Sequence, residues 1–401
     1  MQHDSPPDLP LTGFTVVELS DSASAPFAGH LLAGLGAEVW KVERPGGDSA
    51  RSWGPSQWRG CGAAFHALNR GKRSICLDIK DPVQLATLHD LIERHADVFL
   101  HNLRPGSSGQ YQLDPESLRA RKPELVVCEV GAYGHTGPLS KLPGYDPLMQ
   151  AFSGIMMLTG EDGQAPVRAG VSIVDCGTGM WAVIGTIAAL LRRERKQVGA
   201  TVNVSLLETA IAWMSIGIAN YAADGNPGRR HGSGVAFIVP HRAYEAADGH
   251  AIISAANDRL FARLAEALGH PEWGIDPKFA TNAGRLENRQ EIDILIGNVM
   301  RQHTREHWQK HLDGFGLPCA SVQTTGELYA HEQTRALGIL GKTSEEEIDL
   351  VGVPLSFDCR RPPPLDSAPE VGQNNEHLRQ ILQGGVDDPR HPKSRTRKST
   401  V

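Results

Sequence analysis

The stretch TVVELSDSASAPFAGHLLAGLGAEVWKVE, residues 15–43, decides the fold of this chain. Its first five residues, Thr15–Leu19, predict a short buried strand, and its last six, Glu38–Glu43, predict a second one. Between them, residues 27–35 place apolar side chains at helical spacing, and Gly36 ends that helix. A strand, a helix and a strand with short connections form a βαβ unit, so we expect a parallel sheet.

The alternation of strands and helices continues along the first half of the chain. Further strands are predicted at residues 73–80, 97–101, 125–130 and 201–205. Helices are predicted at residues 82–94 with Asp81 as a cap, 113–119, 148–153 and 206–221. The glycine- and tryptophan-rich segment up to Asn69 is expected to be irregular. The turn after the first strand lies where open α/β sheets bind ligands, but it lacks the Gly-x-Gly-x-x-Gly fingerprint of dinucleotide sites.

A second domain is predicted where the composition changes after Asp224. Two alternating segments, 242–246 and 250–254, are joined by Ala-Asp-Gly and predict a β-hairpin. Helices are predicted beyond it at residues 259–268, 285–301 and 305–312. The fold class is therefore α/β, with a large parallel-sheet domain and a smaller α+β domain. We assign residues 1–224 and 326–383 to the large domain, 225–325 to the small domain, and 384–401 to a disordered basic tail.

Composition and charge argue against several classes of protein. A net charge of −6 without a dominant basic face argues against a nucleic-acid partner. No apolar run reaches membrane-spanning length and the first residues lack a signal-peptide pattern, so we expect a cytoplasmic protein. The six cysteines are scattered, which favours reduced thiols. His303, His307 and His311 share a helical spacing, but no cysteine lies nearby, so we expect a solvated helix face and no metal site.

One carboxylate stands out in the stretch VSIVDCGTGM, residues 171–180. An apolar run, expected to be a buried strand, ends at Asp175, and two glycines lead into an apolar helix at residues 180–191. The positive end of that helix would favour an anion. Two interpretations follow. Asp175 or Thr178 caps the helix, or Asp175 is a nucleophile held in a tight glycine-lined turn.

Several ordered segments together resemble one family, the class III CoA-transferases. This group includes formyl-CoA transferase, carnitine CoA-transferase and the related α-methylacyl-CoA racemases. The resemblance runs from about residue 11 to about residue 365. The matching segments are Leu11–Gly13, Gly34–Glu43, Pro45–Asp48, Asn69–Ser74, Asn102–Gly106, Gly144–Asp146, the stretch around Asp175, and Gly316–Ala320.

The resemblance implies a fold, an assembly and a mechanism. It implies a Rossmann-like large domain plus a small domain, with two chains threaded through each other as an interlocked homodimer. It also places the catalytic carboxylate of the family on Asp175. That carboxylate would take the acyl group from a CoA thioester as a mixed anhydride and then carry CoA as an aspartyl thioester. An anhydride must be kept from water, and the resemblance assigns this shielding to Gly232, Ser233 and Gly234.

The resemblance also assigns the contacts to coenzyme A, which is a substrate here; no permanently bound cofactor is expected. The matching positions lie in loops at strand ends and in the segment that flanks the thioester. They are Arg44, Leu77, Ile79, Lys80, Asn102, Leu103, Arg104, Tyr145 and Asp146. Surface charge remains an alternative for Arg44 and Lys80, and ordinary core packing remains one for Leu77 and Ile79.

Three positions depart from the family pattern. Ala23 stands where formyl-CoA transferase has a glutamine for its small acid, which argues against oxalate as a substrate. Gln110 stands where many relatives have a second arginine, so one phosphate contact is in doubt. Tyr145 stands where racemases have a histidine, and a phenol with a pKa of about 10 is a poor base at neutral pH. CoA transfer is therefore favoured over racemisation.

The sequence thus predicts an enzyme that moves CoA from an acyl-CoA, such as succinyl-CoA, to a carboxylic acid. Arg229, Arg230 and His231 lie next to the shielding loop and could bind the second carboxylate of a dicarboxylate acceptor. Two alternatives stay open. The first is a racemase-like isomerase with Asp175 as an acid or base, and the second is a non-catalytic CoA-binding protein.

Overall fold

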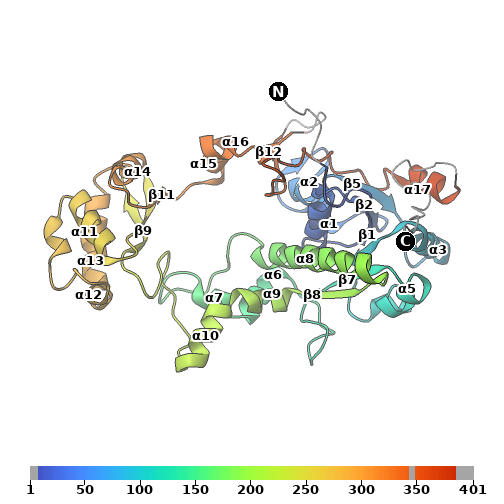
Figure 1. The fold of residues 1–401 in the computed structure, drawn as a ribbon, viewed down its shortest axis with the longest axis horizontal. Helices are drawn as coiled ribbons and strands as arrows, with labels where there is room; N and C mark the ends of the chain where they lie inside the picture. The colour runs from blue at the N-terminus through green and yellow to red at the C-terminus, as the bar shows by residue number, and fades with distance from the viewer. Residues whose placement is uncertain (1–7, 343–347, 385–401) are drawn as a thin grey trace, which may run out of the picture. The chain divides into compact units, whose positions relative to one another are not determined.

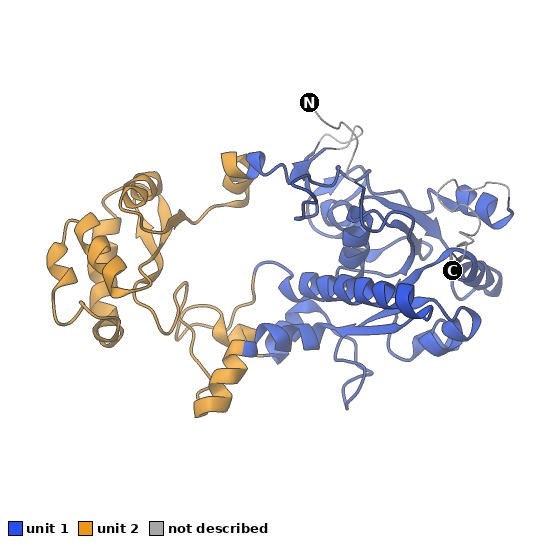
Figure 2. Cartoon of the chain, in the orientation of Figure 1, with its two compact units in different colours: residues 1–153, 170–215, 334–401 blue, residues 154–169, 216–333 orange. Residues whose placement is uncertain are grey.

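The structure is a computed structural model that describes residues 8–342 and 348–384. The chain forms two compact units (Figure 2), and each is made of segments that are separate in the sequence. The first unit comprises residues 1–153, 170–215 and 334–401, and the second comprises residues 154–169 and 216–333.

The observed unit boundaries differ from the expected ones mainly at residues 154–169, which group with the second unit. The backbone N–H of Gly232 donates to the carbonyl of Gly160 at 3.0 Å, and the guanidinium of Arg230 donates to the carbonyl of Gln164. These contacts join segments about 70 residues apart, so local composition gave no sign of them. The tail predicted to be disordered lies, beyond Gly384, outside the described residues.

Six parallel strands form the central sheet of the first unit (Figure 1). Their order is β5-β2-β1-β6-β7-β8, so the chain begins in the middle of the sheet and extends it in both directions. Every neighbouring pair is parallel. The strands are β1 Thr15–Leu19, β2 Glu38–Glu43, β5 Lys72–Cys76, β6 Val98–His101, β7 Val126–Gly131 and β8 Thr201–Ser205.

Both faces of the sheet are covered, as is usual for a parallel sheet. On one face, Val16, Val98 and Val126 pack with helices α1, Ser24–Gly34, and α8, Ile173–Lys196. The neighbouring residues of each strand point to the other face, where the core is shared with further helices. Those helices are α3 Pro82–His95, α5 Pro115–Arg121 and α17 Asn375–Leu382.

Three local predictions for the first unit were wrong. The strand expected before Asp175 is absent, because α8 already begins at Ile173. A short apolar run does not distinguish a buried strand from the start of a buried helix, which explains the error. The single helix expected at 206–221 is interrupted at Met214, giving α9, Leu206–Trp213, and α10, Ser215–Asp224, of which α10 groups with the second unit.

The third wrong prediction concerns the segment before Asn69, which was expected to be irregular. It holds a small hairpin and a helix. Its elements are η1 Ser49–Ser52, β3 Gln57–Trp58, β4 Cys61–Gly62 and α2 Ala63–Asn69. The remaining elements of the unit are α4 Ser107–Gln110, α6 Asp146–Phe152, β12 Leu340–Gly341 and β13 Leu350–Val351.

The second unit is built on the predicted hairpin. Strands β9, His241–Ala246, and β10, Gly249–Ser254, pair antiparallel, and β11, Cys319–Ser321, joins the edge of β10. Helices pack around this sheet and supply the unit with a core of its own. They are α11 Asp258–Ala267, η2 Pro271–Gly274, α12 Asn282–Glu287, α13 Arg289–Met300 and α14 Arg305–Gly314. The unit also includes α7 Ile155–Leu158, α10 and α15 Thr325–Ala330, and its boundary falls within α16 Glu332–Ala336.

Candidate active site

Asp175 lies in the first turn of α8, two residues after the helix begins. The predicted position at a helix N-terminus is confirmed, although no strand precedes it. Neither of the two residues expected as caps has that role. The hydroxyl of Thr178 donates to the carbonyl of Val174 inside the helix at 2.7 Å, and no described residue donates a hydrogen bond to the Asp175 carboxylate. The side chain is half-buried and free to act on a ligand.

The two glycines after Asp175 were expected to form a tight turn, and they lie instead inside α8. A Cβ atom on Gly177 would come within 2.6 Å of the Trp213 side chain on α9. On Gly179 it would come within 2.7 Å of the Ser24 carbonyl at the start of α1. Both glycines therefore let helices approach α8 closely. The second contact places the first turns of α8 beside the loop that follows β1.

The N-terminus of α8 is capped from another part of the chain. Asp146 begins α6, and its Oδ2 accepts the backbone N–H of Val174 at 2.8 Å and that of Asp175 at 3.1 Å. Its Oδ1 accepts the side-chain amide of Gln150 at 2.5 Å. The side chain is buried, with 2% of its surface exposed. Asp146, predicted as a contact to coenzyme A, is thus also a structural partner of the Asp175 backbone.

The electrostatic environment makes the carboxyl group of Asp175 unusually basic. Burial, followed by the negative charge of Asp146, raises its pKa from 3.8 to about 7. The same two carboxylates and burial raise the pKa of the neighbouring Cys176 thiol, with burial as the largest cause. A carboxyl group that is half ionised near neutral pH and has no fixed partner is a strong candidate for covalent or acid–base chemistry.

The loops after β1, β2 and β6 meet at Asp21. The side chain of Asn102 makes two hydrogen bonds to the backbone of Asp21. Its Oδ1 accepts a hydrogen bond from the Asp21 N–H at 3.1 Å, and its Nδ2 donates one to the Asp21 carbonyl at 2.7 Å. The Asp21 carboxylate pairs with Arg44 at 3.5 Å and accepts the N–H of Ser49 at 3.2 Å. Asp21 thus brings together Arg44 and Asn102, which were predicted as contacts to coenzyme A, although Asp21 itself was not predicted as a site residue. Its place as an aspartate in the small-residue turn after the first strand was the sequence feature that could have identified it.

A network of buried ion pairs also holds these loops in place. Lys41 bridges Glu18 at 3.1 Å and Asp48 at 2.7 Å, and Lys72 pairs with Glu18 at 2.8 Å. All four side chains are fully buried. Lys72 also donates to the carbonyl of Pro26 at 2.8 Å, so the network reaches the start of α1. Removing one member would leave an unpaired buried charge, which costs about 3–5 kcal/mol.

The other predicted contacts lie at the same edge of the sheet. Glu43 and Cys76 are paired in the register of β2 and β5, so Arg44 and Leu77 follow neighbouring strand ends. Leu77 is buried, Ile79 is half-buried and Lys80 is exposed. Tyr145 precedes α6 and is 64% exposed, in contrast to the buried Asp146 beside it in the sequence.

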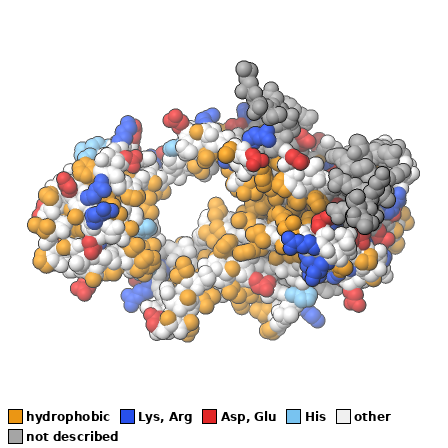
Figure 3. Space-filling view, in the orientation of Figure 1, with side chains coloured by type: hydrophobic (Ala, Val, Ile, Leu, Met, Phe, Trp, Pro, Cys, Tyr) orange, Lys and Arg blue, Asp and Glu red, His pale blue; other side chains and the backbone are white. Residues whose placement is uncertain are grey.

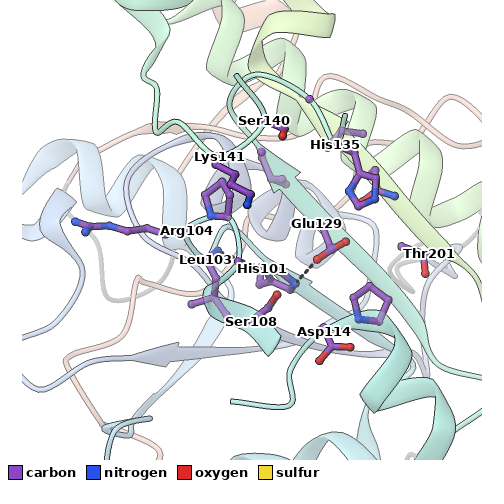
Figure 4. A pocket seen from close by; sticks show the side chains of 18 of the residues that line it. His101, Leu103, Arg104, Ser108, Asp114, Glu129, His135, Ser140, Lys141 and Thr201 are labelled. Carbon is purple, nitrogen blue, oxygen red and sulfur yellow. Dashed lines mark hydrogen bonds and ion pairs between the residues drawn. The ribbon is translucent and has the colours of Figure 1, made fainter. Parts of the chain in front are cut away.

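A cavity of about 930 Å³ opens at the carboxyl ends of β6 and β7 (Figure 4). Leu103 and Arg104, two of the residues predicted to contact coenzyme A, line the cavity, whereas Asp175 lies outside it. His101 and Glu129 point toward each other in it, with Nε2 and Oε1 3.4 Å apart. Arg119 and Lys141 add two more cations to the lining, so basic side chains from two loops and α5 border the same cavity.

The glycine loop predicted as a shield belongs to the second unit. The Ser233 hydroxyl accepts the N–H of Ala243 at 3.0 Å, and Gly232 has a positive φ of 59°. Just beyond the loop, the guanidinium of Arg289 on α13 donates to the carbonyls of Val235 and Ala236 at 2.9 and 3.0 Å. The loop is therefore held at both ends by specific hydrogen bonds.

Two properties of the described residues bear on metal and membrane binding. No group of three or more His, Cys, Asp or Glu side chains in residues 8–342 and 348–384 has the arrangement of a metal site. Among the described helices, α8 alone is long and apolar enough to cross a membrane by length and composition. Half of its apolar window is buried inside the protein.

Comparisons with known proteins agree with this arrangement. The sequence model of CoA-transferase family III matches residues 11–375. A succinyl-CoA:glutarate CoA-transferase from Mus musculus is 32% identical over 95% of this chain and 88% of its own. A succinate–glutarate CoA-transferase from Agrobacterium fabrum is 35% identical over 82% and 84%. A succinyl-CoA–D-citramalate CoA-transferase from Chloroflexus aurantiacus is 34% identical over 95% and 96%.

A solved structure shows the same fold. A CAIB/BAIF family protein from Brucella suis superposes with a TM-score of 0.87 at 33% identity, covering 94% of this chain and all of that one. The matches span residues of both units. The chain therefore belongs to CoA-transferase family III and is a class III CoA-transferase.

Proposed function

We propose that this enzyme transfers CoA from succinyl-CoA to a second dicarboxylic acid, with Asp175 as the nucleophile. The observation that carries the proposal is the state of Asp175, a half-buried carboxylate that accepts no hydrogen bond from residues 8–342 and 348–384 and whose pKa is raised to about 7 by burial and by Asp146. The named relatives act on succinyl-CoA with glutarate or citramalate, or on succinate with glutarate, and these acids are all dicarboxylates. Their chemistry supports the same substrate class here.

The chemistry proceeds in two balanced halves. A carboxylate oxygen of Asp175 attacks the thioester carbon, the C–S bond breaks, and CoA thiolate leaves a mixed anhydride. The thiolate then attacks the Asp175 carbonyl, the donor acid leaves, and an aspartyl-CoA thioester remains. The acceptor carboxylate attacks that thioester, and the released thiolate attacks the acceptor carbonyl of the new anhydride. Asp175 is regenerated as a carboxylate, and the thioester bond energy is retained throughout.

Coenzyme A is proposed to bind along the strand-end loops of the first unit. Arg44 and Lys80 are exposed cations at this edge, and Arg104 and Lys141 line the adjoining cavity. Guanidinium and ammonium groups of this kind suit the phosphates of the nucleotide. Lys141 supplies a further positive charge in this cavity.

The acceptor's second carboxylate is proposed to interact with the basic residues next to the glycine loop. Arg229 is exposed, and Arg230 is held by its bond to the carbonyl of Gln164. Burial and the charge of Arg289 lower the pKa of His231, so the arginines supply the permanent charge there. Exclusion of water by this loop would protect the anhydrides from hydrolysis.

The decisive experiment follows an oxygen atom. With an acceptor acid labelled with ¹⁸O in its carboxylates, the mechanism leaves one labelled oxygen on Asp175 in each turnover, which peptide mass spectrometry detects. Hydroxylamine added during turnover should convert Asp175 to its hydroxamate. The Asp175→Asn variant, assayed with a panel of CoA donors and organic acids, should show no transfer. Exchange of the α-proton of an acyl-CoA with D₂O, without labelling of Asp175, would instead support a racemase-like isomerase.

We also propose that the enzyme is a cytoplasmic homodimer that needs no resident cofactor, because the Asp175 carboxylate carries the covalent step. Apolar side chains gather over the first unit in the region of α8 (Figure 3). Met180, Trp181, Ile184 and Leu191 of this helix are between 40 and 58% exposed. An exposed apolar stripe of this length is typical of an interface. Light scattering should give twice the mass of the chain, and Ile184→Lys should weaken the dimer.

A further inference from the structure

A buried carboxylate beside a nucleophilic carboxylate needs an explanation. Asp146 is 2% exposed, and its hydrogen bonds come from uncharged amides of Val174, Asp175 and Gln150. No cation among the described residues pairs with Asp146, so its hydrogen bonds must offset the cost of removing the carboxylate from water. A neutral side chain would fill the space at lower cost if packing were the only requirement.

We propose that Asp146 is the positioning residue of this active site, because it clamps the first turn of α8 to α6 and sets a second negative charge beside Asp175. This inference rests on the proposed function, in which Asp175 is the nucleophile. Asp146 itself touches no reacting atom in this scheme. It acts through the backbone of the residue that does.

The clamp is needed because α8 does not cap itself. Ser172 precedes the helix and makes no side-chain hydrogen bond to its N-terminus. The first free N–H groups of the helix, those of Val174 and Asp175, are taken by Asp146 alone. Gln150, one turn further along α6, is fully buried and fixes the other oxygen of Asp146. The direction of the Asp175 side chain is thus set by a residue of another helix.

The clamp also removes a source of stabilisation for the Asp175 anion. Helix N–H groups usually favour a carboxylate in the first turn, and here two of them already serve Asp146. The result is a more basic, and hence more reactive, carboxylate at Asp175. The helix N-terminus by itself would have had the opposite effect.

The other elements packed against the first turns of α8 bring little charge. On α9, Glu208 accepts the Ser205 hydroxyl at 2.6 Å. On α1, burial and then the charges of Lys72 and Arg70 lower the pKa of His30 to about 4, so its imidazole is neutral. Asp146 and the thiol of Cys176 are therefore the titratable groups that act closely with Asp175.

Three variants separate the charge of Asp146 from its hydrogen bonds. Asp146→Asn keeps an acceptor oxygen for the helix, and Gln150 can rotate its amide to match. Asp146→Ala removes both charge and clamp, and Asp146→Glu restores the charge. Asp81→Asn is the matched control, because Asp81 caps α3 by accepting two backbone N–H groups and a glutamine amide in the same way.

The primary readout is the ionisation state of Asp175. Infrared spectroscopy measures it as a function of pH from the carboxyl band that is present in the wild type and absent in Asp175→Asn. This measurement does not depend on turnover. We expect Asp146→Asn to lower the pKa of Asp175 by about one pH unit or more, with circular dichroism unchanged. The acid limb of the hydroxylamine-trapping rate should move by the same amount. Asp146→Ala should in addition lower the plateau rate about tenfold or more, Asp146→Glu should recover the wild-type midpoint, and Asp81→Asn should leave it unchanged.

A folded Asp146→Asn variant with the wild-type Asp175 pKa and trapping profile would overturn the inference and leave the proposed function intact. Equal loss of stability in Asp146→Asn and Asp81→Asn, without any change in the acid limb, would also overturn it. Failure of the proposed function looks different, because in that case Asp175→Asn itself would still transfer CoA.

Discussion

Replacing Asp175 by asparagine should abolish CoA transfer and at the same time stabilise the protein at neutral pH. The pKa of Asp175 is about 7 in the fold because of burial and Asp146, against 3.8 for an ordinary aspartate. Since the folded value lies above the unfolded one, deprotonation favours the unfolded chain. The stabilisation that protonated Asp175 gives the fold is fully present below about pH 3.8. It decreases as the pH rises and is fully lost above about pH 7.

The two pKa values set the size of the effect. Their difference corresponds to about 4 kcal/mol as an upper limit. Because the side chain is half-buried, water screens part of this penalty, and we expect Asp175→Asn to gain about 1–2 kcal/mol at pH 8. For units of 150–250 residues, each kcal/mol corresponds to about 2–4 °C in Tm.

Differential scanning calorimetry of both proteins from pH 4 to pH 8 measures this directly. The Tm difference should be small at pH 4, grow toward pH 7 and then level off. Asp8→Asn is the control for net charge, because Asp8 is an exposed carboxylate. A Tm difference that is constant with pH, or an Asp175→Asn protein less stable than wild type at pH 8, would refute the reasoning about burial and charge.

Three further predictions concern a glycine of α8, the segment that follows the glycine loop, and the loop after β6. Gly179→Ala should destabilise the protein and lower transfer, because the new Cβ would meet the Ser24 carbonyl at 2.7 Å, whereas Gly314→Ala, with open space around it, should be tolerated in thermal unfolding. Arg289→Gln should loosen the loop after Ser233 and raise acyl-CoA hydrolysis relative to transfer, measured by free thiol release without acceptor, and an unchanged ratio would contradict the role of that clamp. Asn102→Ala should raise KM for the CoA donor about tenfold with a smaller change in kcat, since it holds the Asp21 backbone at two points; an effect confined to kcat would argue against this position.

The local pattern of the sequence was sufficient for most of the sheet. The strands β1, β2 and β8 begin and end at the predicted residues, and Asp81 caps α3 as expected. Such features depend on neighbours a few residues away, so they are visible in the sequence. The start of α8 was not, because an apolar run before Asp175 fits a buried strand and a buried helix equally well.

The sequence by itself determined the identity of the family and singled out Asp175, because the order of short segments along the chain is preserved without any knowledge of their contacts. Only the tertiary structure decided what that carboxylate experiences. Its helix is capped by Asp146, 29 residues earlier in the chain, and its two glycines admit neighbouring helices rather than form a turn. Burial and like charge act through space, so the raised pKa of Asp175 arises only when α6 and α8 come together.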